Sequence, residues 1–316
     1  MLFLCASVQL RAQQSDTNSI ESVKAKAESG DAVAQYNLGT VYNQGQGVAR
    51  DYAEAAKWFR KAADQNFAAA QYNLGVCYRD GQGVAKDETE AVSWFRKAAD
   101  QNLAMAQYNL GVCYDAGQGV EQDAVEAVKW YRKAAEQNLA YAQCNLGAFY
   151  EHGVGLPKDY VEAVNLYRKA AEQNYALAQF NLGSCYANGQ GVAQDAVEAV
   201  KWYRKAAEQN LAVAQCNLGL CYATSQGVTQ DYAEAIKWFR KAAEQNNSLA
   251  QYDMGDCCMN GNGVVKDYVE AYKWFNLASA QGDQDAKRLL SIIESRMTAD
   301  QIAEAQRLSR EFVAHK

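Results

Sequence analysis

The 316-residue chain has one proline, Pro157, and two histidines, His152 and His315. No segment alternates apolar and polar residues with the period of two that strands show, so no β-sheet is expected. So few histidines exclude a multi-histidine metal site. The chain also lacks the Ser-x-x-Lys, His-Glu-x-x-His and Gly-x-Ser-x-Gly motifs of known hydrolases. We therefore predict that the protein is not an enzyme and carries no cofactor.

Charge of one sign is not concentrated along the chain. Its 31 basic and 37 acidic residues give a formal net charge of −6. Arg60 and Lys61 recur as a pair, but Glu54 and its equivalents offset them, so nucleic acid is not an expected partner. Beyond the N-terminus no apolar run is long enough to span a bilayer, so no integral membrane segment is expected.

The chain instead repeats one 36-residue pattern seven times, with no insertion or deletion. A tripeptide marks each copy: Asn37-Leu38-Gly39, its returns at Asn73, Asn109, Asn145, Asn181 and Asn217, and Asp253-Met254-Gly255. We use "phase" for a position within the repeat, so the Tyr36 phase is Tyr36 and its equivalents. A fixed period of this length is typical of solenoids, in which neighbouring units bury their apolar faces jointly.

Each copy encodes two helices joined by a glycine turn. Apolar side chains at helical spacing predict a first helix, and two glycines in residues 45–47 predict a turn after it. Asp51 and Glu54 fit a capping box, in which the aspartate accepts a backbone N–H and the glutamate bonds back to the cap residue. The second helix is expected to end at Asn66, because asparagine tolerates the left-handed conformation.

The ends of the chain depart from the pattern in ways that suit caps. We expect residues 15–30 to form an N-terminal capping half-repeat, residues 31–282 the seven repeats, and residues 283–316 C-terminal capping helices. Thr298 and Gln301 suggest a further capping box at the start of the last helix.

This pattern resembles the Sel-one-like repeat (SLR), a relative of the tetratricopeptide repeat. In the first copy the resemblance is carried by Ala34, Leu38, Gly39, Tyr42, Gly45, Gly47, Val48, Asp51, Ala55, Trp58, Phe59, Lys61, Ala62 and Ala63. It implies an all-α fold, a right-handed α-solenoid of seven 36-residue helix–turn–helix repeats with terminal caps. Two departures are Asn66, where the family commonly has glycine, and Ser225, which replaces a loop glycine.

The resemblance also implies a function: a non-enzymatic scaffold or adaptor that binds a protein or peptide, in the bacterial envelope or outside the cell. Two alternatives stay open. One is a protein of the same family that binds or hydrolyses β-lactams or cell-wall material, and the other is a structural spacer.

Residues 1–14 resemble a truncated secretory signal. Residues 1–10 are apolar, and Leu10-Arg11-Ala12 places a small residue before a Gln-rich stretch. This predicts a periplasmic or secreted protein, or a cytoplasmic one if the segment is not a signal.

The nine cysteines do not suggest a disulfide framework. Five share one first-helix phase: Cys77, Cys113, Cys185, Cys221 and Cys257. Equivalent helices pack roughly 8–10 Å apart, which exceeds the roughly 7 Å Cα separation that a disulfide allows. We expect these cysteines to be small buried apolar residues rather than disulfides or metal ligands.

By analogy with tetratricopeptide repeats, the exposed face of the first helices is expected to line a concave groove that binds an extended or helical peptide. Residues there vary among the repeats, so packing does not constrain them. An alternative for the Tyr36 phase is partial burial between repeats. The predicted binding residues are Tyr36, Tyr72, Arg79, Tyr108, Asp115, Tyr141, Glu151, Phe180, Leu220, Tyr252 and Met259.

Overall fold

The computed structural model describes residues 20–314. The predicted signal segment 1–14, residues 15–19 of the expected half-repeat, Cys5 and His315 lie outside the described residues. Every regular element within 20–314 is a helix, which confirms the all-α prediction.

Each repeat contributes a first and a second helix, each 13 residues long. The first helices are α2 (Ala32–Gln44), α4 (Ala68–Asp80), α6 (Ala104–Ala116), α8 (Ala140–His152), α10 (Ala176–Asn188), α12 (Ala212–Thr224) and α14 (Ser248–Asn260). The second helices are α3 (Tyr52–Asp64), α5 (Glu88–Asp100), α7 (Ala124–Glu136), α9 (Tyr160–Glu172), α11 (Ala196–Glu208), α13 (Tyr232–Glu244) and α15 (Tyr268–Ala280). Residues 20–28 are helical before the first repeat, and α16 (Gln284–Glu294) and α17 (Ala299–Ala314) follow the last.

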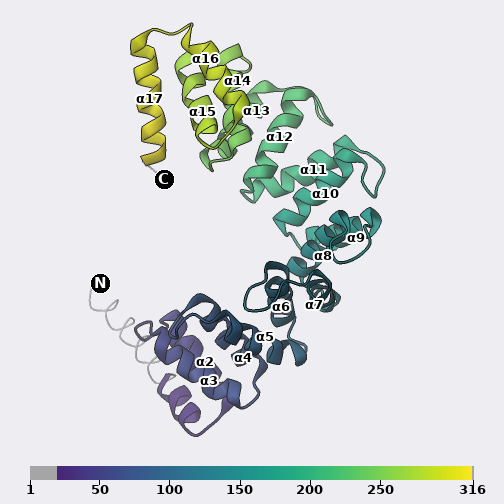
Figure 1. The fold of residues 1–316 in the computed structure, drawn as a ribbon, viewed down its shortest axis with the longest axis vertical. Helices are drawn as coiled ribbons and strands as arrows, with labels where there is room; N and C mark the ends of the chain where they lie inside the picture. The colour runs from purple at the N-terminus through teal and green to yellow at the C-terminus, as the bar shows by residue number, and fades with distance from the viewer. Residues whose placement is uncertain (1–19, 315–316) are drawn as a thin grey trace, which may run out of the picture. The chain divides into compact units, whose positions relative to one another are not determined.

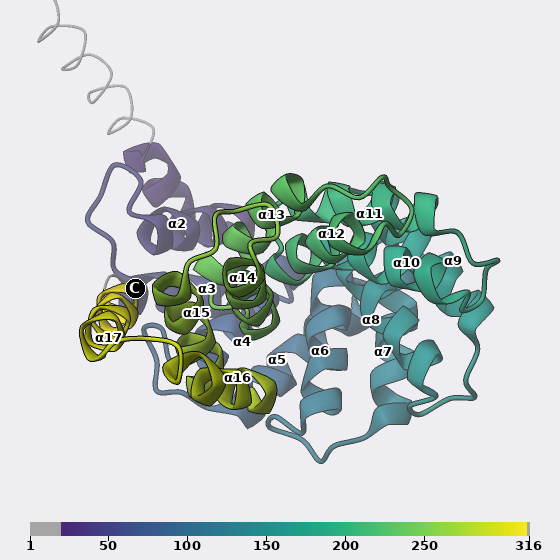
Figure 2. The ribbon, with the colours of Figure 1, turned by 90° about the horizontal axis from the view of Figure 1, so that it is seen from above.

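The chain forms two compact units, divided between Lys158 and Asp159. Within each unit, consecutive repeat helices pack against each other (Figure 1). In unit 2, α17 departs from this order and packs against α15 (Figure 2). The ring of Phe312 on α17 meets that of Trp274 edge-on, with centroids 5.4 Å apart. The two last helices therefore both pack against the last helix of the seventh repeat.

The helix boundaries lie where the local signals place them. Gly45 ends α2 with a φ of 71°, and the side chain of Asp51 opens α3 by accepting the N–H of Glu54 at 2.9 Å. Asn66 follows α3 with a φ of 63°, and the asparagines at its phase all adopt the left-handed conformation: Asn102, Asn138, Asn174, Asn210 and Asn246. The boundaries are predictable because each depends on contacts within a few residues.

The second half of the predicted capping box is wrong for the repeats. The N–H of Asp51 donates to the carbonyl of Tyr42 at 3.0 Å, because the loop folds back onto the first helix. The carboxylate of Glu54 instead accepts from Lys57 at 3.0 Å. A reciprocal box does form at the last helix, where Thr298 and Gln301 exchange bonds of 2.9 and 3.3 Å.

The second loop glycine is required by a close approach between repeats. Gly83 has a φ of 73°, and a Cβ there would lie 1.9 Å from the carbonyl oxygen of Tyr52 in the preceding repeat. No side chain fits into that space. The first loop position is less crowded, since Ser225 adopts a φ of 60° there and its hydroxyl donates to the carbonyl of Val228.

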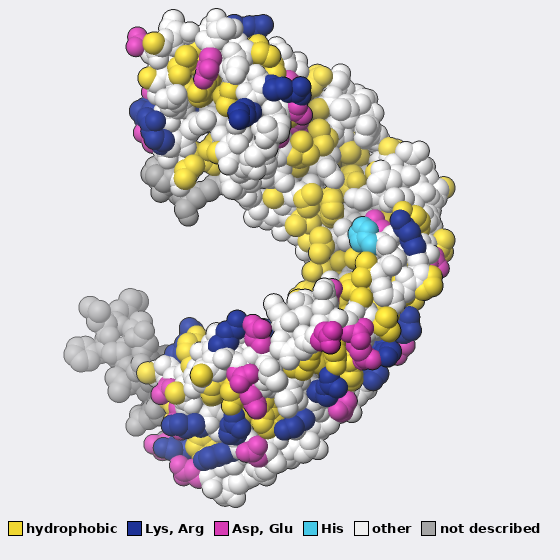
Figure 3. Space-filling model, in the orientation of Figure 1, with side chains coloured by type: hydrophobic (Ala, Val, Ile, Leu, Met, Phe, Trp, Pro, Cys, Tyr) yellow, Lys and Arg dark blue, Asp and Glu magenta, His cyan; other side chains and the backbone are white. Residues whose placement is uncertain are grey.

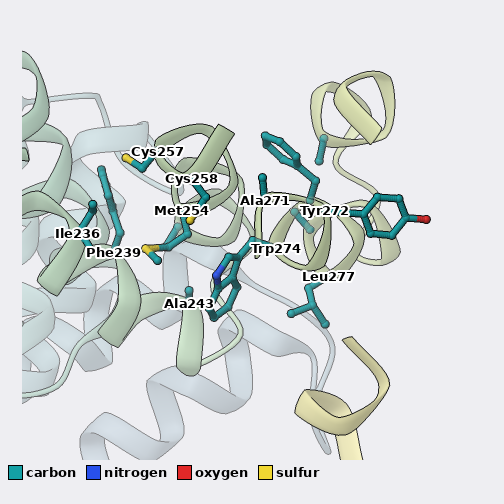
Figure 4. Close-up of a cluster of buried hydrophobic side chains, with 14 of the residues drawn as sticks. Ile236, Phe239, Ala243, Met254, Cys257, Cys258, Ala271, Tyr272, Trp274 and Leu277 are labelled. Carbon is teal, nitrogen blue, oxygen red and sulfur yellow. The ribbon is translucent and has the colours of Figure 1, made fainter. Parts of the chain in front are cut away.

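Aromatic rings of the second helices form the centre of each repeat. The ring of Phe59 is fully buried and lies where a Cβ on Gly39 would be only 2.7 Å away, which explains the invariant glycine of the tripeptide. Figure 4 shows a buried cluster near the end of unit 2, in which Phe239 and Met254 lie with Cys257. All eight described cysteines are buried and form no disulfides, as predicted.

A row of side-chain amides links successive repeats, and we call it the amide ladder. Gln71 on α4 is buried and donates to the carbonyl of Ala63 and to the side chain of Asn66. Gln101 donates to the side chains of both Gln71 and Asn66. The bond between glutamines spans 2.7–2.8 Å and recurs between Gln65 and Gln35, Gln137 and Gln107, Gln209 and Gln179, Gln245 and Gln215, and Gln281 and Gln251.

The recurring Arg-Lys pair has a structural role. The ammonium of Lys61 lies 3.8 Å from the ring centroid of Trp58, and the guanidinium of Arg60 donates to the hydroxyl of Tyr78 in the next repeat. These side chains stabilise the second-helix surface through cation–π and inter-repeat contacts.

Candidate interaction surface

The two helix types carry different surfaces. Lysines and glutamates of the second helices pair with each other, as Lys57 does with Glu54. Two first helices of unit 2, α10 and α12, contain no aspartate, glutamate, lysine or arginine. Figure 3 shows apolar side chains gathered over these two helices. The first-helix surface is therefore the less charged one.

The aromatic residues predicted at the Tyr36 phase are half-buried. Tyr36 packs on the buried ring of Phe59 in its own repeat, with centroids 5.9 Å apart, and on Phe67 of the next repeat at 5.3 Å. Equivalent centroid separations of 5.7–5.9 Å join Tyr72 to Phe95, Tyr108 to Tyr131, Phe180 to Tyr203 and Tyr252 to Phe275. Each ring thus covers the core and exposes one edge.

The side chains at the Val33 phase are more exposed than those at the Tyr36 phase. Val33 is 52% exposed and Tyr141 46% in unit 1, while Leu177 is 38% and Leu249 47% exposed in unit 2. Ala69, Met105 and Val213 complete the phase and are half-buried. We call these seven side chains the apolar row. Of the apolar row, only Tyr141 was among the predicted binding residues. The other six could have been identified from the sequence, because every repeat has an apolar side chain at this outward-facing phase.

The remaining predicted residues lie toward the C-terminal ends of the first helices and are half-buried. In unit 1, Arg79 donates to the side chain of Asn109 at 2.9 Å and pairs with Asp80, while Asp115 accepts from the hydroxyl of Tyr131 at 3.4 Å. Glu151 lies near the end of α8. In unit 2, Leu220 and Met259 pack against the core cluster of the last repeats.

The predicted residues are divided between the two units. Unit 1 contains Tyr36, Tyr72, Arg79, Tyr108, Asp115, Tyr141 and Glu151. Unit 2 contains Phe180, Leu220, Tyr252 and Met259.

The titratable groups near this surface are held neutral or are paired. Burial raises the pKa of Tyr72 and of Tyr108. Burial likewise raises the pKa of Cys77 and of Cys113 to about 11, so both thiols stay protonated at neutral pH and are weak nucleophiles. Within residues 20–314 no group of three or more His, Cys, Asp or Glu side chains could hold a metal ion.

No helix in the described part of the chain is both long and apolar enough to cross a membrane.

Comparison with known proteins identifies the repeat. The Sel1 repeat family model matches seven consecutive segments: residues 32–67, 68–103, 104–139, 140–175, 176–211, 212–247 and 248–283. The solved structure of c5321, described as a protective antigen present in uropathogenic Escherichia coli strains and displaying an SLR fold, is 38% identical with a TM-score of 0.82. The solved structure of a Sel1 repeat protein from Oxalobacter formigenes is 33% identical with a TM-score of 0.71. The match covers 89% of this chain and 81% of that protein's chain.

The shared regions differ in extent. The c5321 match covers 92% of this chain but 64% of that protein. A sel1-like repeat-containing protein, L18 of Acanthamoeba polyphaga mimivirus, is 48% identical over 46 residues, which are 15% of this chain and 8% of the viral protein. The chain therefore spans less than two thirds of the length of these two relatives.

Proposed function

The chain belongs to the Sel1 repeat family, and we propose that it is a non-enzymatic scaffold that binds a protein or peptide along its first-helix faces. Sel1 repeats are generally protein-interaction scaffolds without catalytic activity. In each unit, the partner surface would comprise that unit's members of the apolar row together with the half-buried aromatic rings beside them.

The apolar row is the observation that carries this proposal. Val33, Tyr141, Leu177 and Leu249 expose between 38% and 52% of their surface at one phase of the repeat. Apolar side chains that recur at one exposed position gain stability only when something covers them. Tyrosine beside aliphatic groups is also typical of protein-binding surfaces.

The test compares the two helix types at equal exposure. Val33 on α2 and Val197 on α11 are 52% and 53% exposed, so replacing either by serine removes a similar apolar area. The immobilised full chain would be incubated with envelope and secreted fractions of the source organism, and retained proteins identified by mass spectrometry. We expect Val33→Ser combined with Tyr141→Ser to lose a retained partner, and Val197→Ser combined with Val125→Ser to keep it.

Other results would contradict the proposal. Equal loss from both pairs of substitutions would mean that the first-helix face does not bind the partner. Retention of no protein by the unaltered chain would favour a spacer or a small-molecule ligand.

We also propose that the protein is exported to the periplasm or beyond. The support is the apolar stretch of residues 1–10 and the small residue Ala12 that follows it. N-terminal sequencing of the protein from an envelope or secreted fraction should begin after residue 12. An intact N-terminus recovered only from the cytoplasm would contradict export.

A further inference from the structure

An open pocket of about 540 Å³ lies in unit 2 between α10, α11 and α12. Its walls include Ala187 and Asn188 from α10, Tyr203 from α11, and Asn217 and Leu220 from α12. Of these only Leu220 belonged to the predicted binding residues. The volume lies in the range of pockets that hold a small ligand, so one peptide side chain fits with room to spare.

The pocket is open because a small residue stands at a phase that carries a charged side chain in three repeats of unit 1. Ala187 is the equivalent of Arg79 and Asp115 in unit 1. Arg79 extends to the amide of Asn109, which is the equivalent of Asn217, and so occupies the corresponding space. With only a methyl group at Ala187, the space beside Asn217 stays unfilled.

The lining of the pocket combines polar and apolar side chains and carries no charge. The hydroxyl of Tyr203 donates to Ser184 at 3.2 Å, and burial raises its pKa, so it remains protonated at neutral pH. Cys221 in the pocket wall also has its pKa raised by burial, to about 11. No acidic or basic side chain lines the pocket. A charged ligand group would therefore lose its hydration without gaining an ionic partner.

The next repeat boundary has different chemistry. Ala223 is again a small residue at this phase, but Asp253 and Asp256 replace Asn217 and Leu220 there. The neutral lining therefore belongs to the boundary between repeats five and six, and it distinguishes that boundary from its neighbour.

We propose that this pocket is a specificity pocket, which accepts one uncharged side chain of an extended peptide while the amides of Asn188 and Asn217 bond the adjacent peptide backbone. The inference rests on the proposed function and names the partner class at one point of the same surface. Side-chain amides both donate and accept hydrogen bonds, as a peptide backbone requires.

The test uses a displayed library of random peptides of about 12 residues, which reach up to about 40 Å when extended. The library is selected on the immobilised full chain, and affinities of the enriched peptides are measured by fluorescence polarisation. Ala187→Arg reproduces the arrangement that Arg79 makes with Asn109, so the fold should tolerate it. The control is Val197→Arg, which adds the same charge to an exposed position of α11.

We expect enriched peptides to share one uncharged side chain, and Ala187→Arg to weaken them about tenfold or more. Val197→Arg should change the affinity by less than about twofold. Changing the shared peptide residue to glycine should weaken binding to the unaltered chain but not weaken it further in the Ala187→Arg variant.

The other possible outcomes would contradict the proposal in different ways. Peptides that bind but are indifferent to Ala187→Arg would overturn the pocket and leave the scaffold function standing. A library that yields no binder would contradict both the peptide specificity of the pocket and the proposed scaffold function. Binding of neutral oligosaccharides that Ala187→Arg abolishes, with no peptide enriched, would assign the pocket to a carbohydrate instead.

Discussion

Gln101 at the end of α5 donates its side-chain amide to the side-chain oxygen of Gln71 on α4, across a distance of 2.7 Å. Gln71 is buried, so this bond satisfies a polar group that water does not reach. The same amide of Gln101 also bonds Asn66, so each step of the amide ladder joins the end of one repeat to the preceding one. The ladder sets the register of neighbouring repeats through polar contacts, while the buried rings supply apolar contacts.

Removing one glutamine of the amide ladder should destabilise unit 1. Gln107 donates to Ala99 and Asn102 and accepts from Gln137, so Gln107→Leu leaves several buried groups unpaired. We expect a loss of about 1–3 kcal/mol in the free energy of unfolding, measured by urea denaturation. The same change at the exposed loop residue Gln118 should stay within about 0.5 kcal/mol. Equal effects at both sites would show that the ladder does not contribute.

The asparagine that follows six of the seven second helices should stabilise the fold more than the glycine common in the family. Asn102 has a φ of 63° and accepts hydrogen bonds from both Gln107 and Gln137. Asn102→Gly keeps the conformation but loses both bonds, and Asn102→Ala also places a Cβ in the left-handed region, at a further cost of about 1–2 kcal/mol. Urea unfolding should therefore rank stability as Asn, then Gly, then Ala. A glycine variant as stable as the original would show that the side-chain bonds are unimportant.

A methyl group should not be tolerated at the glycine of the repeated tripeptide. On Gly111 a Cβ would lie 2.7 Å from two carbons of the buried Tyr131 ring. The overpacking costs about 1–3 kcal/mol, which outweighs the roughly 1 kcal/mol that alanine gains over glycine in a helix. Thermal unfolding followed by circular dichroism should show a lower midpoint for Gly111→Ala. At the exposed Ala53 the opposite substitution, Ala53→Gly, should also lower stability, because there only the lower helix propensity of glycine acts.

Unit 2 should lose stability as the pH rises from about 4 to about 7. Asp253 stands where the other six repeats have asparagine, and burial, then the neighbouring charge of Asp256 and the more distant Asp283, raise its pKa to about 7, against a hydrogen bond with Cys216 that lowers it. Because the folded state holds this proton more tightly than the unfolded state, the stabilisation is complete below the unfolded pKa and is lost as the pH rises through the folded pKa.

The corresponding experiment compares Asp253→Asn with the unaltered chain across that pH range. The variant restores the asparagine of the other repeats, so we expect it to be more stable by about 1–3 kcal/mol at pH 8 and nearly equal at pH 4. Chemical denaturation at each pH gives the difference directly. A constant difference across the range would mean that Asp253 does not titrate in this window.

Much of the fold could be predicted because its determinants are local. Asp51 caps a helix through the N–H of Glu54, three residues away, and Asn66 ends that helix through its own backbone angle. Such signals are readable from one stretch of sequence, and seven copies in phase made the solenoid evident. The neutral, buried state of the cysteines followed from the same periodicity.

Other features depend on residues that the sequence does not place side by side. Pairing Asp51 with Glu54 suggested a reciprocal cap, but the loop directs the N–H of Asp51 to Tyr42 instead. Likewise, no local sequence pattern predicts the hydrogen bond from Gln101 to Gln71, 30 residues earlier.

The sequence by itself determined the helices, their ends and their repetition, because backbone conformation responds to neighbouring residues. Only the tertiary structure decided how much of each first-helix side chain stays exposed. Tyr36 is half-covered by packing on Phe59, whereas Val33, three residues earlier, remains 52% exposed. Exposure depends on the rings of other helices, and so does the pocket beside Ala187, which exists because α10, α11 and α12 meet around a methyl group.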